Sequence, residues 1–246
     1  MKPKPISPNL PYTLPAENAE AWYALNAELT ACRACPRLVA WREKVAREKR
    51  RAYRDWEYWG KPVPGFGDPQ ARLFIVGLAP GAHGSNRTGQ MFTGDSSGDT
   101  LFGALHRAGF ANQPSARRRE DGLVLHDAFI TAIGRCAPPQ NKPTRAELNA
   151  CQPFLRREWA LMPQVRVVLA LGKMAFDDIL RLWRADGFDV PRLKFGHGAE
   201  AAVNLNGRTV HLLASYHPSR QNTQTGRLTL QMLDDVFARA RALVEN

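Results

Sequence analysis

Four short apolar runs stand out along the chain, each bounded by glycine, proline or polar residues. They cover residues 71–77 (ARLFIVG), 128–133 (AFITAI), 165–171 (VRVVLAL) and 209–215 (TVHLLAS). Continuous apolar runs, unlike alternating ones, are typical of parallel strands that are buried on both faces. We therefore expect these runs to be the core strands of one sheet.

Apolar residues at helical spacing lie between and around these runs. They predict helices over residues 16–30 and 99–110, from Thr144 onward, after Gly172, and over residues 228–240. Asn206-Gly207 predicts a tight hairpin turn between residues 202–205 and 208–215. Strands that alternate with helices favour a three-layer α/β/α fold with a central, mostly parallel sheet of about four strands. We expect residues 1–246 to form a single domain, with residues 1–15 as a proline-rich N-terminal arm.

A long glycine-rich loop follows the first predicted strand, over residues 77–98. Loops of this length without structure of their own are uncommon unless they serve a function. Parallel strands bring the loops at their carboxyl ends to one edge of the sheet. The sequence therefore predicts that residues 79–95, 136–141 and 217–219 converge there.

The charge of the chain points to a polyanionic partner, with nucleic acid as the first candidate. The chain carries 34 Lys and Arg against 23 Asp and Glu, a formal net charge of +11. The basic and aromatic segment over residues 37–62 either faces DNA or packs its aromatic rings on the body, and the sequence does not decide between the two. No run of 18 apolar residues and no signal-peptide pattern occurs, so we expect a cytoplasmic protein without membrane contact.

Four cysteines suggest a metal site, because disulfide frameworks are rare in cytosolic chains. Cys32 and Cys35 form a C-x2-C pair, and Cys136 and Cys151 lie fifteen positions apart. Four thiolates suit either a tetrahedral zinc ion or a 4Fe–4S cluster, and the long second spacing favours the cluster. The alternative is that some of these cysteines are small buried apolar residues. A site of this kind would staple the N-terminal segment to the helix that begins at Thr144.

The predicted convergence of loops collects a carboxylate (Asp95), an aromatic ring (Phe92), an amide (Asn141) and an imidazole (His217). Such a set suits a reaction whose leaving group is a flat heterocycle. The ring stacks on it, the amide reads its edge, the imidazole donates a hydrogen bond to it, and the carboxylate faces a developing sugar cation. Each residue also has a structural interpretation: Asp95 as a helix cap, Phe92 as core and Asn141 as turn chemistry.

With these residues assembled, the chain resembles the uracil-DNA glycosylase superfamily, and specifically its family 5. The motifs that carry the resemblance are GLAPGAHGSNRTG (77–89), MFTGD (91–95), CAPPQNKPT (136–144), HPSRQNTQTGR (217–227) and the four cysteines. The resemblance implies the α/β/α fold of that family. It also implies a 4Fe–4S cluster on Cys32, Cys35, Cys136 and Cys151, and monofunctional removal of uracil and other deaminated bases from DNA.

Carried over by position, the resemblance assigns base stacking to Phe92, stabilisation of the departing base to His217 and assistance of the attacking water to Asp95. Asn141 matches the reader of the base edge. We further expect base contacts from Gly81, Ala82 and His83, and DNA contacts from Asn86, Arg87, Ser219 and Arg220.

This sequence departs from the wider superfamily at three positions of the predicted site. Ala79 replaces a water-activating aspartate, Leu78 a glutamate and Ala132 a base-reading asparagine. A pocket with fewer groups that read the base edge discriminates less sharply, so we expect release of hypoxanthine as well as uracil. We expect a monomer. The alternatives are a non-catalytic DNA-binding protein with a cluster and, with less support, an iron–sulfur electron carrier.

Overall fold

A computed structural model describes residues 16–245, so the expected N-terminal arm over residues 1–15 lies outside the described part of the chain. The helices are α1 (Ala16–Ala31), α2 (Pro36–Glu48), α3 (Ser85–Thr88), α4 (Ser96–Arg107), α5 (Arg145–Ala160), α6 (Lys173–Ala185), α7 (Arg220–Gln224) and α8 (Leu230–Glu245), with short 3-10 turns η1 (Arg51–Tyr53) and η2 (Pro139–Asn141). The strands are β1 (Phe66–Gly67), β2 (Leu73–Gly77), β3 (Ala128–Ala132), β4 (Val167–Leu171), β5 (Glu200–Leu205) and β6 (Arg208–Ser215).

The strands form one sheet in the order β1-β3-β2-β4-β6-β5. The four predicted core strands are neighbours in it, and β2 with β3, β2 with β4 and β4 with β6 all pair in parallel. The expected number of about four strands is corrected to six, because β1 and β5 add antiparallel edges. β5 is the first arm of the predicted hairpin. β1 is only two residues long and lies in a glycine- and proline-rich segment, so its sequence reads as a turn.

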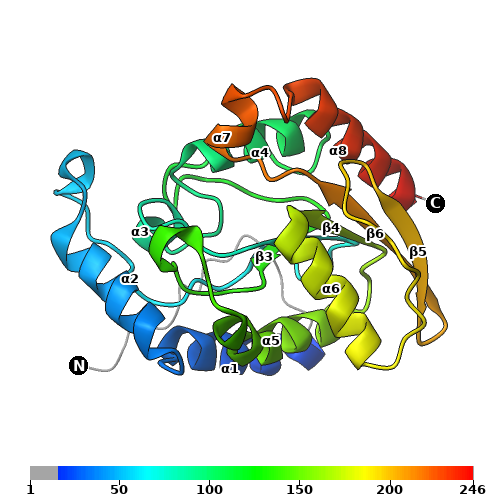
Figure 1. Cartoon of the computed structure of the whole chain (residues 1–246), viewed down its shortest axis with the longest axis horizontal. Coiled ribbons are helices and arrows are strands. Elements are labelled where there is room, and N and C mark those ends of the chain that lie inside the picture. Colours follow the sequence, from blue (N-terminus) through cyan, green and yellow to red (C-terminus); the bar gives the residue numbers. More distant parts are fainter. Residues whose placement is uncertain (1–15, 246) are drawn as a thin grey trace.

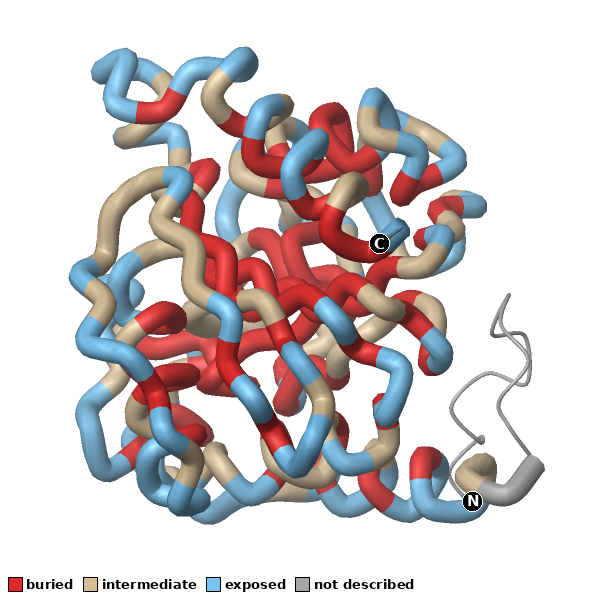
Figure 2. The backbone as a smooth tube through the Cα atoms, turned by 90° about the vertical axis from the view of Figure 1, so that its right-hand side faces the viewer, coloured by how far each residue is buried: buried red, intermediate tan, exposed pale blue. Residues whose placement is uncertain are grey.

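Helices cover both faces of the sheet, as the three-layer prediction requires (Figure 1). Along β2, Leu73 and Ile75 face a core that is closed by α4 and α8. Phe74 and Val76 face the opposite core, which α1, α5 and α6 close. This burial on both sides explains why the strand sequences are continuously apolar. Figure 2 shows the resulting buried centre of the molecule.

Local signals set the ends of several elements as predicted. The Thr144 hydroxyl accepts a hydrogen bond from the Glu147 amide, and the Glu147 carboxylate accepts one from the Thr144 amide, which is a capping box at the start of α5. Asn206 and Gly207 both have positive φ, as a two-residue hairpin turn needs. The helix predicted from residue 99 begins earlier, at Ser96, because Asp95 caps it. Among the described residues, no helix has the length and apolar character needed to cross a bilayer.

Candidate active site

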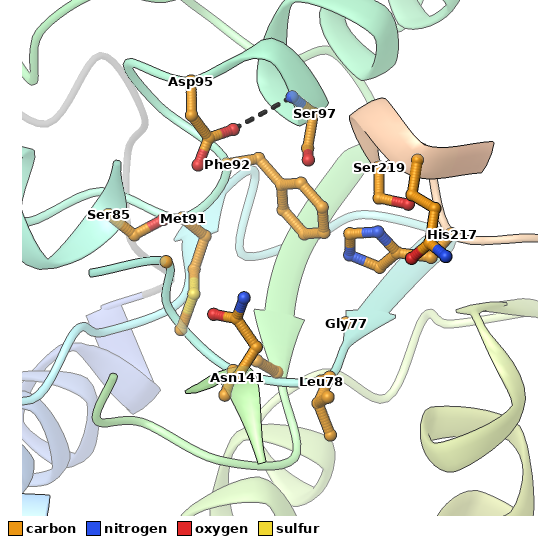
Figure 3. A pocket seen from close by; sticks show the side chains of 14 residues that line it. Gly77, Leu78, Ser85, Met91, Phe92, Asp95, Ser97, Asn141, His217 and Ser219 are labelled. Carbon is orange, nitrogen blue, oxygen red and sulfur yellow. Dashed lines mark hydrogen bonds between the residues drawn. The ribbon is translucent and has the colours of Figure 1, made fainter. Parts of the chain in front are cut away.

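A cavity of about 340 Å³ opens at the carboxyl ends of the parallel strands. The loops after β2, β3 and β6 all contribute to it, as the sequence predicted (Figure 3). Its lining is half apolar and half polar, and consists of Gly77, Leu78, Ala79, Gly81, Ser85, Met91, Phe92, Asp95, Ser97, Ala132, Asn141, His217, Ser219 and Gln221. A volume of this size suits a small ligand such as a single base.

Phe92 lies flat against the end of β2 because position 77 is glycine. A β-carbon at position 77 would lie 2.9 Å from the Cζ atom of the Phe92 ring. Phe92 itself has a φ of +54°, a conformation that is uncommon for a bulky residue and costs free energy. The loop therefore holds the ring at the cavity at the expense of backbone strain.

His217 lies next to Phe92 in the lining of the cavity, and the two rings are stacked (Figure 3). The two ring centroids are 5.7 Å apart and the ring planes are inclined by 29°. The backbone carbonyl of His217 accepts hydrogen bonds from the Ser219 amide and from the side-chain amide of Asn222, each at 2.8 Å, which fixes the turn that carries the imidazole. Burial lowers the pKa of His217 to about 4. The imidazole is therefore neutral at pH 7 and can donate one hydrogen bond into the cavity.

Asp95 combines the structural and the chemical interpretation of the sequence. Its Oδ1 atom accepts hydrogen bonds from the amides of Ser97 and Gly98, at 3.0 and 3.1 Å, and so caps α4. Its Oδ2 atom points toward the glycine loop, where a β-carbon at position 84 would lie only 2.0 Å away. Burial raises the pKa of Asp95, although the two amide hydrogen bonds oppose this effect. One oxygen is thus committed to the helix while the other remains available to the cavity.

Asn141 reaches the cavity from the loop after β3. It has a φ of +58° and follows Gln140, which has a φ of +54°. Asparagine tolerates this left-handed conformation better than most residues. The residue is exposed, and its side-chain amide points into the cavity from the side opposite Asp95 (Figure 3).

Of the three other residues predicted to contact the base, one lines the cavity and two do not. Gly81 lines the cavity, whereas Ala82 and His83 are not part of its lining. The Nδ1 atom of His83 instead lies 3.1 Å from the Tyr58 hydroxyl, within hydrogen-bonding distance. Burial lowers the pKa of His83, and the positive charges of Arg50 and Arg87 add to this effect. His83 therefore joins the glycine loop to the segment that follows α2.

The predicted DNA contacts by Asn86 and Arg87 are contradicted by their burial. Asn86 is 0% exposed, and its side-chain amide donates to the Arg42 carbonyl at 3.2 Å. Arg87 is 3% exposed and is enclosed by the rings of Tyr53 and Trp56. A sequence shows a polar loop here, but side chains from a distant segment cover it. Both residues hold the loop in place.

Ser219 and Arg220, the other two residues predicted to contact DNA, are accessible to solvent, and their DNA contacts stay a prediction. Ser219 lines the cavity and caps α7 through a hydrogen bond from the Asn222 amide to its hydroxyl, and Arg220 is exposed at the first position of that helix. Met91, Ser97 and Gln221 also line the cavity, although they were not predicted from the sequence. Their positions beside Phe92, Asp95 and Ser219 are the signal that could have found them.

The four cysteines come together, as predicted. They line one small cavity of about 20 Å³ between α1, α2 and α5, together with the buried side chain of Arg42. Burial raises the pKa of the thiols of Cys35, Cys136 and Cys151, in the last case to about 12. Within residues 16–245, no group of three or more His, Cys, Asp or Glu side chains is arranged to hold a single metal ion.

Arg42 is a buried cation beside these cysteines. It is 2% exposed, and its Nη1 atom lies 2.8 Å from the sulfur of Cys136, while Nη2 donates to the Cys32 carbonyl at 3.0 Å. No carboxylate in the described part of the chain pairs with it. The other buried arginine near this site, Arg135, has a full ion pair with Glu158. A buried charge without a counter-ion is costly, so a negatively charged group bound in this cavity would stabilise the charge of Arg42.

Comparison with known proteins places this chain in a family. The chain matches the family model described as the uracil DNA glycosylase superfamily over residues 64–241. It is 54% identical over 220 residues to the type-5 uracil-DNA glycosylase of Mycobacterium leprae, covering 89% of this chain and 94% of that protein. It is 53% identical over 215 residues to the type-5 uracil-DNA glycosylase of Thermus thermophilus, covering 87% and 94%.

More distant relatives carry related names. The type-4 uracil-DNA glycosylase of Pyrobaculum aerophilum is 32% identical over 166 residues, which are 66% of this chain and 74% of that protein. The segment that the family model matches, residues 64–241, contains the loops that line the cavity after β2, β3 and β6. The chain therefore belongs to the uracil-DNA glycosylase superfamily.

Proposed function

We propose that this protein is a monofunctional DNA glycosylase that removes uracil from DNA by hydrolysis of the N-glycosidic bond. The observation that carries the proposal is the single cavity that joins Phe92, a neutral His217 and the free oxygen of Asp95. Pure phosphate binding needs none of these three groups. The type-5 names of the Mycobacterium leprae and Thermus thermophilus relatives support the same activity.

The geometry supports a dissociative reaction on a base that has left the duplex. A flipped uracil stacks on Phe92, and Asn141 hydrogen-bonds to its edge. As the bond from the base to C1′ breaks, its electron pair leaves with the base, and His217 donates a hydrogen bond to the oxygen that gains negative charge. A neutral imidazole can perform this task because one of its ring nitrogens still carries the proton that the hydrogen bond needs.

Asp95 acts on the sugar side of the reaction. Its free carboxylate oxygen stabilises the positive charge that develops on the sugar and orients the water that adds to C1′. The water proton passes to solvent or to the departing base. No lysine is among the residues that line the cavity, so no amine is placed to form a Schiff base, and we infer that the enzyme leaves the DNA strand intact.

The apolar part of the lining bears on the choice of base. Leu78, Ala79 and Ala132 supply no hydrogen bonds from their side chains. A pocket that does not hydrogen-bond most of a ligand's edge rejects analogues only weakly. We propose that hypoxanthine and modified pyrimidines are also released.

The cysteine cavity is a candidate site for a 4Fe–4S cluster held by Cys32, Cys35, Cys136 and Cys151. Such a cluster spreads its ligands over four iron atoms, so its thiolates need not converge on one point. The donor set and the unpaired charge of Arg42 both suit a group that carries net negative charge. Bound there, it would cross-link the chain between α1 and α2 to α5 and to the loop after β3.

The central test measures single-turnover release of uracil from a duplex. We expect Asp95→Asn and His217→Ala each to slow release by about 10²- to 10³-fold, with DNA affinity retained. Asparagine is also a good helix cap, so the first variant removes charge while it keeps the start of α4. Asp99→Asn and His106→Ala, which alter exposed residues of the same helix, are the matched controls. No release by the unaltered protein would leave a non-catalytic DNA-binding protein.

The pH dependence of kcat/KM follows from the two pKa shifts. His217, with a pKa of about 4, stays neutral through pH 5 to 8, so we expect no inflection near the ordinary histidine value of about 6.5. The raised pKa of Asp95 means that its carboxylate is lost at a higher pH than usual as the solution is acidified. Activity should therefore fall on the acid side through Asp95, and Asp95→Asn should flatten that limb. An inflection between pH 6 and 7 that persists in Asp95→Asn would contradict the neutral state of His217.

Base preference can be measured on duplexes with hypoxanthine opposite thymine. We expect its release to lie within about 100-fold of uracil release, because few side chains read the base edge. Ala132→Asn adds an amide to the lining and should widen the gap in favour of uracil. Ala132→Val controls for the added volume. Undetectable hypoxanthine release by the unaltered enzyme would refute the relaxed preference.

The role of Arg42 is measurable without the glycosylase reaction. We expect the purified protein to contain iron and acid-labile sulfide, and Arg42→Met to lose iron to a chelator about 10-fold faster, since outer partners of metal ligands typically matter to that extent. Arg33→Gln, an exposed arginine in the same C-x2-C segment, should behave as the unaltered protein. Zinc without sulfide, or equal iron loss in both variants, would refute the assignment.

A further inference from the structure

The segment that follows α2 is not accounted for by the proposed chemistry, although it is the most basic and aromatic part of the chain. It runs over residues 49–61 and projects from the body beside α2 (Figure 1). Together with residues 117–121 it carries eight Lys or Arg against four Asp or Glu. The rings of Tyr53, Trp56 and Trp59 are half-buried and that of Tyr58 is buried. The segment therefore neither turns all its rings toward DNA nor packs all of them on the body.

A stack around Arg87 fixes this segment to the glycine loop. The guanidinium carbon of Arg87 lies 3.9 Å from the centre of the Tyr53 ring and 4.0 Å from that of Trp56. The same guanidinium donates to the carbonyls of His83 and Gly94, each at 2.8 Å. The amide of Trp59 closes the arrangement by donating to the Arg87 carbonyl at 2.9 Å. A planar guanidinium between two rings makes a rigid joint.

The loop that contains residues 117–119 is attached to the same joint. The amide of Gly94 donates to the Ala116 carbonyl at 3.0 Å, directly before Asp95. The guanidinium of Arg118 lies 5.9 Å from the Trp56 ring, and that of Arg119 lies 4.9 Å from the Trp59 ring. Both segments are therefore held beside the cavity.

Five exposed arginines project from these two segments: Arg50, Arg51, Arg54, Arg117 and Arg118. We call them the rim arginines. None of them is among the ion pairs of residues 16–245, whereas exposed cations elsewhere are commonly paired, as Arg107 is with Asp234 and Arg239 with Glu200. The carboxylates of the same segments form no ion pair with them; these are Asp55, Glu57, Glu120 and Asp121, the last of which accepts hydrogen bonds from the backbone amides of Arg117 and Arg118. Free arginines on a rigid frame can bind phosphates with little loss of conformational freedom.

We propose that the rim arginines bind the backbone of duplex DNA that flanks the flipped nucleotide. This inference rests on the proposed function, because a base inside the cavity leaves its neighbouring phosphates at the rim. In this arrangement Arg87 contacts no DNA. It is a positioning residue whose buried charge holds the rings that support the rim arginines.

The test compares two matched triple variants in binding to an undamaged 20-base-pair duplex. Arg50→Gln, Arg51→Gln and Arg54→Gln form the rim variant. Arg166→Gln, Arg184→Gln and Arg192→Gln form the control. These arginines are exposed and form no ion pair within the described chain. They lie beside the amino end of β4 and the last turn of α6, away from the cavity. A second rim variant, Arg117→Gln with Arg118→Gln, guards against a folding defect in the first.

We expect the rim variant to bind the duplex at least about 10-fold more weakly at physiological salt. The slope of log affinity against log salt is negative, and its magnitude should fall by about 2 to 3, since each lost phosphate contact removes about 0.9. The double variant should lower the slope by about 1 to 2. The enzyme concentration that gives half-maximal uracil release should rise in both variants, in step with their weaker binding to the duplex. The control triple should keep the unaltered slope.

Equal weakening in the rim and control triples would overturn the proposal, because it would show a diffuse charge effect. Weakening confined to single-stranded DNA would overturn the duplex assignment. The proposed function fails separately, if the unaltered protein releases no uracil. A protein without base release whose duplex binding still depends on the rim arginines would refute the glycosylase and keep the surface.

Discussion

The parallel alignment of β2, β3, β4 and β6 is the constraint on which the rest of the structure depends. Helices cover both faces of these strands, so the strands themselves can carry almost no polar side chains. Polar chemistry is confined to the loops at their ends, and parallel pairing places the carboxyl ends together. The cavity is the direct result, because three loops that are far apart in sequence are given one common edge.

Within that cavity the glycine loop supplies residues that hold the fold and that also take part in the proposed reaction. Asp95 uses one carboxylate oxygen to begin α4 and keeps the other for the cavity. Phe92 is held in a strained conformation by a contact that only glycine at position 77 allows. A site that is strained and rigid before the ligand arrives does not have to be ordered during the reaction. The neutral state of His217 is likewise set before any ligand binds, because burial of the imidazole lowers its pKa.

The cysteine region and the cavity are joined by short, direct contacts. The guanidinium of Arg42 meets Cys136, while its backbone carbonyl accepts a hydrogen bond from Asn86. The side-chain amide of Asn86 makes that bond, while its backbone amide donates to the carbonyl of Gly81, which lines the cavity. Whatever stabilises the fold around the cysteines therefore also supports the loop that carries Asp95 and Phe92. The joint around Arg87 extends this support to the basic segment after α2.

The sequence by itself determined the four core strands, the layers, the loops that converge and four side chains that line their common cavity, those of Phe92, Asp95, Asn141 and His217. Each of these has a local signature: an apolar run, a capping box, an Asn-Gly turn or a glycine-rich motif. The two edge strands, the exposure of the cations and the partners of the buried charges have no such signature. Arg87 stands among polar residues, and nothing beside it shows that Tyr53 and Trp56 enclose it. Only the tertiary structure decided these points, because burial and pairing depend on what distant segments bring to a residue.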